Sequence, residues 1–185
     1  WTHEPYHDIT TSSKIKIDNQ IIHVMNVYTG DVFTHNYRYF YFNNKLPLHT
    51  TETFRNPNKT VVAFSTKYEE DYYKNNKFTT LPKRYEIINW GHQHNKLLVW
   101  GKGWGQMAQG NSRDSPDKGA EKGMTLRNYD FNVALENTEM PYYVTEKIWE
   151  SIAYGCLPIY WSNSTIYQTF PENSFIDYRQ FSDPE

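Results

Sequence analysis

The chain has 185 residues, a formal net charge of −2 and one cysteine, Cys156. A single cysteine excludes a disulfide framework within the chain, and the near-neutral charge gives no electrostatic basis for binding nucleic acid or an acidic membrane. No run approaches the ~20 apolar residues of a membrane-spanning helix. Aromatic residues make up 17% of the chain, which suits either a surface that stacks on sugar rings or an aromatic core.

The N-terminal third reads as short strands separated by turns. Strand-like patches occupy residues 14–17, 21–27 and 37–42, with Asn, Asp and Gly between them. The segment "RNPNK" at 55–59 predicts a boundary, so residues 1–58 and 59–185 are interpreted as two units. The chain begins at Trp1 rather than methionine, and we expect it to be a piece of a longer protein.

Beyond the boundary, strands alternate with helices. Taken in chain order, the predicted elements are a strand at 60–65, a helix at 81–93, a strand and Gly-rich turn at 96–105, a loop at 110–123, a strand at 129–137, a helix at 145–155 and a strand at 157–161. Strands that alternate with helices predict an α/β fold with a parallel sheet and right-handed crossovers. Cys156 falls between a helix and an apolar strand, so we expect a buried, inert thiol.

The predicted helix at 145–155 contains one cation at an unfavourable position. Thr145 is a suitable N-cap and Gly155 a suitable terminator, and the apolar residues of the helix form one stripe: Ile148, Trp149, Ile152 and Ala153. Lys147 falls in the first turn, where the helix dipole repels a cation. A bound anion, typically a phosphate, would reverse that repulsion, and the adjacent Glu146 would then suit a ribose diol. The alternative is a solvated Glu-Lys pair on a surface helix.

Residues 131–164 carry a longer pattern. An apolar strand is followed by Glu136-Asn137-Thr138, then by Tyr143-Val144-Thr145-Glu146-Lys147, Gly155 and Pro158. This succession resembles the signature of the α1,3/1,4-fucosyltransferases, glycosyltransferase family 10. The resemblance implies a GT-B architecture of two Rossmann-like lobes. Residues 1–58 would then be the end of the acceptor-binding lobe, and residues 59–185 most of the GDP-sugar-binding lobe.

The resemblance also implies a reaction and a donor site. The reaction is inverting transfer of L-fucose from GDP-fucose to a hydroxyl of an acceptor oligosaccharide or glycoprotein, with α1,3 or α1,4 linkage and no obligatory metal cofactor. Lys147 and Arg84 would hold the diphosphate, and Glu146 the ribose. Asn137 and Tyr143 match further donor-site positions. Arg84 is assigned by order and spacing, and the neighbouring Lys83 stays an alternative.

The first residues supply a candidate base and a rival interpretation. "Trp1-Thr2-His3-Glu4-Pro5" resembles the family's Glu-Ser-Pro or Glu-Pro motif, which implies that Glu4 deprotonates the acceptor hydroxyl. The same stretch, His3 to His7, formally fits the H-E-x-x-H zinc signature of metalloproteases. Pro5 obstructs the helix which that signature requires, and no third ligand has a recognisable spacing. The absence of an Asp-x-Asp motif gives no support to a metal-dependent GT-A enzyme.

Two questions stay open at this point. A non-catalytic module that keeps the nucleotide-sugar pocket would share the donor-site residues, and the role of Glu4 separates it from an enzyme. The compartment depends on the source. A eukaryotic protein of this family is expected in the Golgi lumen, anchored to the membrane through its parent chain, whereas a bacterial or viral one is expected in the cytoplasm.

Overall fold

The computed structural model describes residues 13–24, 61–111, 120–141, 143–168 and 170–184. Glu4, the predicted strand at 37–42 and the predicted boundary at 55–59 lie outside these ranges. Two strands of the N-terminal part, β1 (Ser13–Ile17) and β2 (Gln20–Val24), pair antiparallel. Their turn residues, Asp18 and Asn19, both have positive φ, as tight two-residue hairpins require. The first two predicted strand patches are therefore confirmed.

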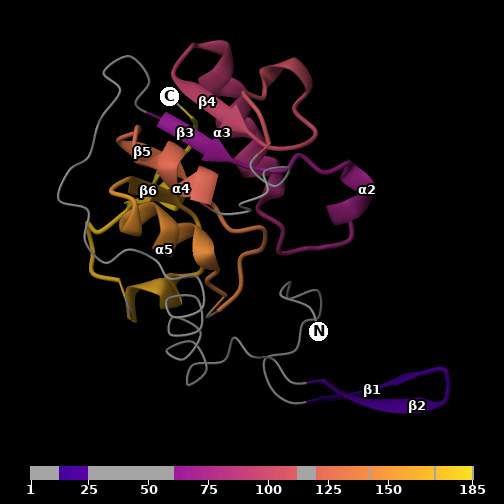
Figure 1. Cartoon of the computed structure of the whole chain (residues 1–185). Coiled ribbons are helices and arrows are strands. Elements are labelled where there is room, and N and C mark those ends of the chain that lie inside the picture. The colour runs from indigo at the N-terminus through magenta and orange to yellow at the C-terminus, as the bar shows by residue number, and fades with distance from the viewer. Residues whose placement is uncertain (1–12, 25–60, 112–119, 142, 169, 185) are drawn as a thin grey trace.

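A five-stranded parallel sheet organises the rest of the described chain (Figure 1). Its strands are β3 (Val61–Phe64), β4 (Leu97–Trp100), β5 (Phe131–Val133), β6 (Leu157–Tyr160) and β7 (Ile176–Asp177). They run side by side in the order β4-β3-β5-β6-β7, and every neighbouring pair is parallel. This is a doubly wound arrangement, in which the direction of winding reverses between β3 and β5. The predicted α/β fold is confirmed.

Helices cover both faces of the sheet. The helices are the short α2 (Glu70–Tyr73), α3 (Leu81–Gln93), α4 (Ala120–Leu126) and α5 (Glu146–Ala153). On one face Ile88 of α3 belongs to the same buried cluster as Ala63 and Val99 of the strands. On the other face Val62 clusters with Leu126 of α4. Because both faces are covered, the strands read as continuous apolar runs rather than alternating ones.

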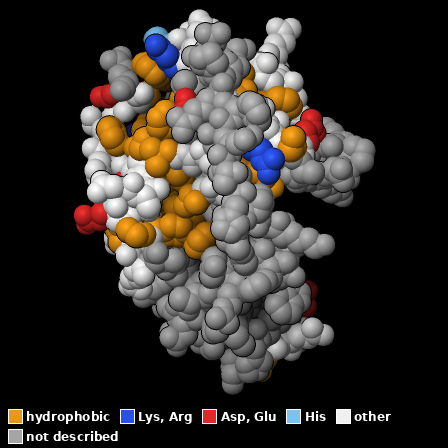
Figure 2. All heavy atoms as spheres, turned by 60° about the vertical axis from the view of Figure 1, so that its left-hand side comes forward, with side chains coloured by type: hydrophobic (Ala, Val, Ile, Leu, Met, Phe, Trp, Pro, Cys, Tyr) orange, Lys and Arg blue, Asp and Glu red, His pale blue; other side chains and the backbone are white. Residues whose placement is uncertain are grey.

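Short 3-10 helices complete the described elements, at Gly105–Met107, Ser164–Gln168 and Tyr178–Gln180. None of the described helices is long and apolar enough to cross a membrane. Figure 2 shows that hydrophobic side chains gather in a band on one face of the molecule. Among the described residues, the large apolar side chains that reach the surface include Met124, Ile152 and Phe181, so the core does not bury the whole apolar set.

Two predicted elements differ from the structure in their bounds. The strand predicted at 129–137 is regular only over 131–133, although the N–H groups of Ala134 and Glu136 continue to donate to β6 and the residue after it. The loop predicted at 110–123 is wrong at its end, where α4 begins at Ala120. Gly123 lies inside this helix, and packing accounts for the glycine, because a Cβ there would lie 2.2 Å from the ring of Tyr154.

The predicted apolar stripe of α5 is also partly wrong. Ile148 is fully buried, but Ile152 is 43% exposed and Ser151 is buried instead. Ser151 tolerates burial because its hydroxyl donates to the carbonyl of Lys147 and accepts from the Asn132 side chain, at 2.7 Å each. The hydrogen-bonded pair of Ser151 and Asn132 therefore lies on the inward face of α5, and that face differs from the one that hydrophobicity predicts.

Both predictions for the residues that follow α5 are confirmed. Gly155 has a φ of +82°, the left-handed conformation that ends a helix. Cys156 is buried, and its thiol donates to the carbonyls of Leu126 and Tyr129 at 3.1 and 3.3 Å. Burial and the neighbouring Asp130 raise the pKa of the thiol to about 12, so Cys156 stays protonated and unreactive at neutral pH.

The Gly-rich turn after β4 gives a test of the fold. Gly101 has a φ of +137°, and a Cβ there would lie 2.0 Å from the carbonyl oxygen of Ser65. We expect Gly101→Ala to lower the free energy of unfolding by about 3 kcal/mol, because it combines backbone strain with a clash against backbone. Urea denaturation followed by tryptophan fluorescence measures the loss.

Gly105 supplies a matched control. Its φ is +58°, and nothing lies within 4 Å of a Cβ built there. Gly105→Ala therefore incurs the left-handed backbone penalty alone, about 1 kcal/mol. Equal losses in the two variants would show that the close approach of Gly101 to Ser65 does not constrain this turn.

Candidate functional site

The predicted site residues converge on the point where the winding of the sheet reverses. Arg84 lies in the first turn of α3, which follows β3, and Asn137 follows β5. Glu146 and Lys147 open α5, the next helix along the chain. In doubly wound sheets, ligands bind in the crevice outside the carboxyl ends of the strands at this reversal. The topology therefore brings four of the six predicted residues to the edge of the sheet where a ligand is expected.

A buried carboxylate organises this edge. Glu136 is fully buried at the end of β5. Its Oε1 accepts from the N–H of Thr145 at 2.8 Å and from the hydroxyl of Tyr160 at 2.7 Å. Its Oε2 accepts from the hydroxyl of Thr145 at 2.7 Å and from Nζ of Lys147 at 3.0 Å. Four accepted hydrogen bonds match the four lone-pair positions of an ionised carboxylate, and Lys147 balances its charge.

This arrangement explains the cation in the first turn of α5. Nζ of Lys147 lies 3.0 Å from Oε2 of Glu136, 2.7 Å from Oγ1 of Thr145 and 4.0 Å from Oε1 of Glu146. Burial lowers the pKa of Lys147, but Glu136 and then Glu146 raise it by more. The net effect is a raised pKa, so the ammonium is charged at neutral pH. Two of its three N–H donors bind within the described chain, which leaves the third for a ligand.

Glu146 differs from Glu136 in its exposure. Its side chain is 37% exposed. Burial raises its pKa, but the cations Lys147 and Lys122 lower it by more, to about 2. Lys122 comes from α4 and also forms an ion pair with Glu150 of α5. Glu146 is therefore an ionised acceptor at the surface, as recognition of hydroxyl groups requires. Its predicted contact with ribose stays a prediction.

Arg84 and Asn137 are brought into direct contact. Arg84 is only 4% exposed, and its Nη2 donates to the carbonyl of Leu135 and, at 2.7 Å, to Oδ1 of Asn137. The alternative residue, Lys83, lies on the exposed side of α3 and pairs with Glu86 at 2.9 Å. The structure therefore places Arg84, and not Lys83, at the reversal point.

The other two predicted residues are Tyr143 and Glu4. The Tyr143 side chain is fully buried, in a small cluster with Met140 and Phe78, and its backbone carbonyl accepts from the Ser162 hydroxyl at 2.9 Å. Its ring and its carbonyl therefore anchor the loop between β5 and α5. Glu4 lies outside the described residues. Within the described ranges, no group of three or more His, Cys, Asp or Glu side chains is arranged to hold a metal ion.

Three residues that organise the site were absent from the predicted set. Glu136 is the first residue of the Glu-Asn-Thr motif and supports a donor site as part of that motif, but the resemblance gives it no role of its own. Thr145 was predicted as an N-cap, but its side chain makes no capping bond and binds Glu136 instead. Tyr160 gave no signal, because its hydroxyl meets a carboxylate 24 residues earlier in the chain.

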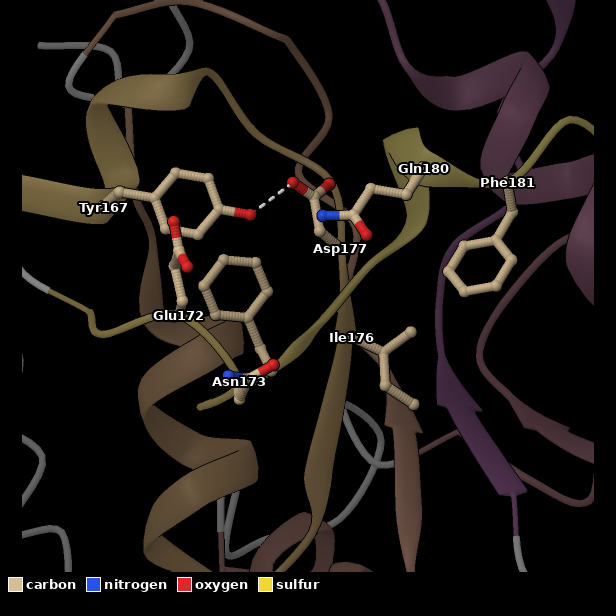
Figure 3. A pocket seen from close by; sticks show the side chains of 8 residues that line it. Tyr167, Glu172, Asn173, Ile176, Asp177, Gln180 and Phe181 are labelled. Carbon is tan, nitrogen blue, oxygen red and sulfur yellow. Dashed lines mark hydrogen bonds between the residues drawn. The ribbon is translucent and has the colours of Figure 1, made fainter.

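A separate hollow lies at the edge strand β7 (Figure 3). Its volume is about 590 Å³, and its lining includes Tyr167, Glu172 and Phe181. Figure 3 shows Tyr167 pointing toward Asp177, to which its hydroxyl donates at 2.6 Å. None of the predicted site residues that the structure describes lines this hollow, so it is distinct from the cluster around Glu136.

A doubly wound α/β lobe with Lys147 and Arg84 at the winding reversal is typical of α/β proteins that bind a ligand at this edge of the sheet. Residues 37–185 match the family described as "Glycosyltransferase family 10 (fucosyltransferase) C-term". The chain belongs to this family, as the motifs around Glu136 and Lys147 predict.

Individual relatives agree with this assignment. The chain is 39% identical over 61 residues to "Alpha-(1,3)-fucosyltransferase B" of Drosophila melanogaster, a match that covers 32% of this chain and 14% of that protein. It is 38% identical over 60 residues to "GDP-fucose protein O-fucosyltransferase 3" of Rattus norvegicus, covering 32% of this chain and 12% of that protein. The matched segments are thus a small part of each relative.

A solved structure supports the fold. The crystal structure titled "alpha1,3-Fucosyltransferase with GDP" superposes with a TM-score of 0.50 at 19% identity. The match covers 81% of this chain and 37% of that one. At this identity the likeness concerns the arrangement of the sheet and helices, and it agrees with the predicted GT-B lobe.

The pair formed by Glu136 and Lys147 predicts a large difference between two lysine variants. We expect Lys147→Met to lower the free energy of unfolding by about 3 kcal/mol, because it leaves the buried carboxylate of Glu136 without its counter-charge. Lys74→Met is the matched control. Its pair with Asp71 is exposed on both sides, so its loss costs under about 1 kcal/mol. Similar values from urea denaturation would contradict the buried pair.

Proposed function

We propose that the protein transfers L-fucose from GDP-fucose to an acceptor hydroxyl with inversion, forming an α1,3 or α1,4 linkage. The observation that carries this proposal is Lys147, which Glu136 holds in the charged form at the N-terminus of α5. Family membership supports the donor, since the rat relative is named for GDP-fucose. The published name of the Drosophila relative supports the α1,3 linkage.

The difficult part of such a transfer is the departure of GDP. When the bond to C1 of fucose breaks, its electron pair leaves with the β-phosphate oxygen. One further negative charge then develops on a diphosphate that already carries two, and it must be stabilised. In the proposed mechanism, Lys147 gives its third N–H to the diphosphate, and the N-terminus of α5 adds its partial positive charge. Arg84 contributes a second positive charge from α3. These groups supply the stabilisation that a metal ion provides in other transferases, so the proposed mechanism requires no metal cofactor.

The other half of the reaction needs a base. Inversion requires the acceptor oxygen to attack C1 from the face opposite GDP, while a base removes the proton of the hydroxyl. We assign this role to Glu4, on the resemblance of its motif. On the donor side, Glu146 accepts hydrogen bonds from the ribose hydroxyls, and the loop from Asn137 to Lys147 selects the nucleotide.

The acceptor class has two candidates. A glycan hydroxyl is favoured by the resemblance to α1,3/1,4-fucosyltransferases, and a protein hydroxyl by the name of the rat relative. We propose an oligosaccharide or glycoprotein acceptor, and a Golgi lumenal, membrane-anchored parent protein if the source is eukaryotic. A bacterial or viral source would place it in the cytoplasm.

Donor turnover tests the proposal. We expect the full natural protein to release GDP from GDP-fucose but not from GDP-mannose, and to release no UDP from UDP-galactose, with the same rates in the presence of a chelator. Acceptor stimulation is compared between a lactosamine oligosaccharide and a serine-containing peptide. Lys147→Ala and Glu4→Gln should each lower kcat by about 10²-fold or more, because each removes a group that acts in the transition state.

Lys74→Ala is the control. Lys74 is exposed at the C-terminal end of α2 and pairs only with Asp71 among the described residues. Its turnover should equal that of the wild type. Preference for another sugar nucleotide would overturn the fucosyl assignment. Tight GDP binding without turnover, in a protein with an intact Glu4, would favour the non-catalytic binding module.

A further inference from the structure

Glu136 is fixed more firmly than the other charged residues of the site. Its N–H donates to the carbonyl of Trp161 at 3.1 Å, and its carbonyl accepts from the hydroxyl of Thr80, the residue that precedes α3. Its carboxylate is fully buried, with all four acceptor positions occupied. The main chain and the side chain of Glu136 thus join the sheet to the beginnings of both α3 and α5.

We propose that Glu136 is a positioning residue, which holds the ammonium of Lys147 at the N-terminus of α5 so that it meets the diphosphate already oriented. This inference rests on the proposed function. Glu136 does not contact the ligand itself, because its side chain is fully buried and its oxygens bind Thr145, Tyr160 and Lys147. It acts through Lys147.

Thr145 acts as a second point of attachment. Its hydroxyl donates to Oε2 of Glu136 and accepts from Nζ of Lys147, at 2.7 Å in both cases. Nζ of Lys147 is therefore held by two acceptors that are themselves bonded to each other. A free lysine side chain loses up to ~2 kcal/mol of conformational entropy when it is ordered. Because Glu136 and Thr145 already order this side chain, binding the diphosphate costs less.

The charge of Lys147 depends on the groups that face it from each neighbouring element. Glu136 faces it from the end of β5, Glu146 from α5 itself, and the cation Arg84 from α3. Tyr160 of β6 faces Glu136 with its hydroxyl, and Lys122 of α4 acts on Glu146. Without the charge of Glu136, burial and Arg84 both favour the neutral amine, and only Glu146 among these groups opposes them.

The test is Glu136→Gln, which keeps the size of the side chain and one acceptor oxygen but removes the charge. Competitive acetylation with mass spectrometry measures the reactivity of the Lys147 amine against pH without any ligand. We expect Lys147 of the variant to be labelled at least tenfold faster than in the wild type at pH 8. The dissociation constant for GDP, from calorimetry, should rise at least tenfold at pH 8.5 and recover at pH 6.5, where the amine is protonated again.

Glu150→Gln is the matched control on the same helix. Glu150 pairs with Lys122 and makes no described contact with Lys147, so neither the labelling of Lys147 nor GDP binding should change. If Glu136→Gln is folded by circular dichroism and the labelling of Lys147 matches the wild type, the proposal is wrong, and Glu136 has only a structural role.

Glu136→Asp keeps the test decisive if the glutamine variant does not fold. The aspartate retains the charge but withdraws the carboxylate by one methylene group. Labelling of Lys147 at pH 8 should stay within threefold of the wild type, while GDP affinity falls about tenfold at every pH. Unchanged affinity in the folded variant would overturn positioning. If labelling responds as expected but the wild type does not bind GDP, the hold on Lys147 is supported and the proposed function is the part that fails.

Discussion

The ion pair between Glu136 and Lys147 is the constraint on which the rest of the site depends. Removing a carboxylate from water costs several kcal/mol, and the attraction of one cation does not by itself offset that cost. Here the hydroxyls of Thr145 and Tyr160 and the N–H of Thr145 complete the set of donors. Because these donors come from α5 and β6, the carboxylate is satisfied only when strand, helix and neighbouring strand are assembled together.

This dependence explains why a cation is tolerated where the helix dipole opposes it. The partial positive charge at the start of α5 is about half an elementary charge, whereas Glu136 brings a full negative charge within 3.0 Å of Nζ of Lys147. The carboxylate therefore outweighs the dipole. The helix N-terminus, the ammonium of Lys147 and the guanidinium of Arg84 thus lie together at the place where a doubly wound sheet receives its ligand.

Regular elements were predictable from the sequence where hydrophobicity alone decided them. The strand at 61–64 and the helix at 81–93 followed from an apolar run and from Pro82 in the first turn. The prediction failed where a side chain had a specific partner. Gly123 lies in a helix because Tyr154 fills the space beside it, and Ser151 faces inward because Asn132 binds it. Such pairings between distant segments have no periodicity that a single sequence displays.

The two glutamates of the site differ in their exposure, and this difference accounts for a lysine at position 147. Glu136 is buried and has all its acceptor positions occupied, while Glu146 is partly exposed and ionised, with a pKa of about 2. Glu136 can therefore position Lys147, whereas Glu146 can accept hydrogen bonds from a ligand. An ammonium has three separately directed donors, which can be divided between two protein acceptors and a ligand, whereas the planar fork of arginine favours a single bidentate partner. A lysine between the buried Glu136 and the exposed Glu146 can thus be held by acceptors of the protein and still donate to a bound anion.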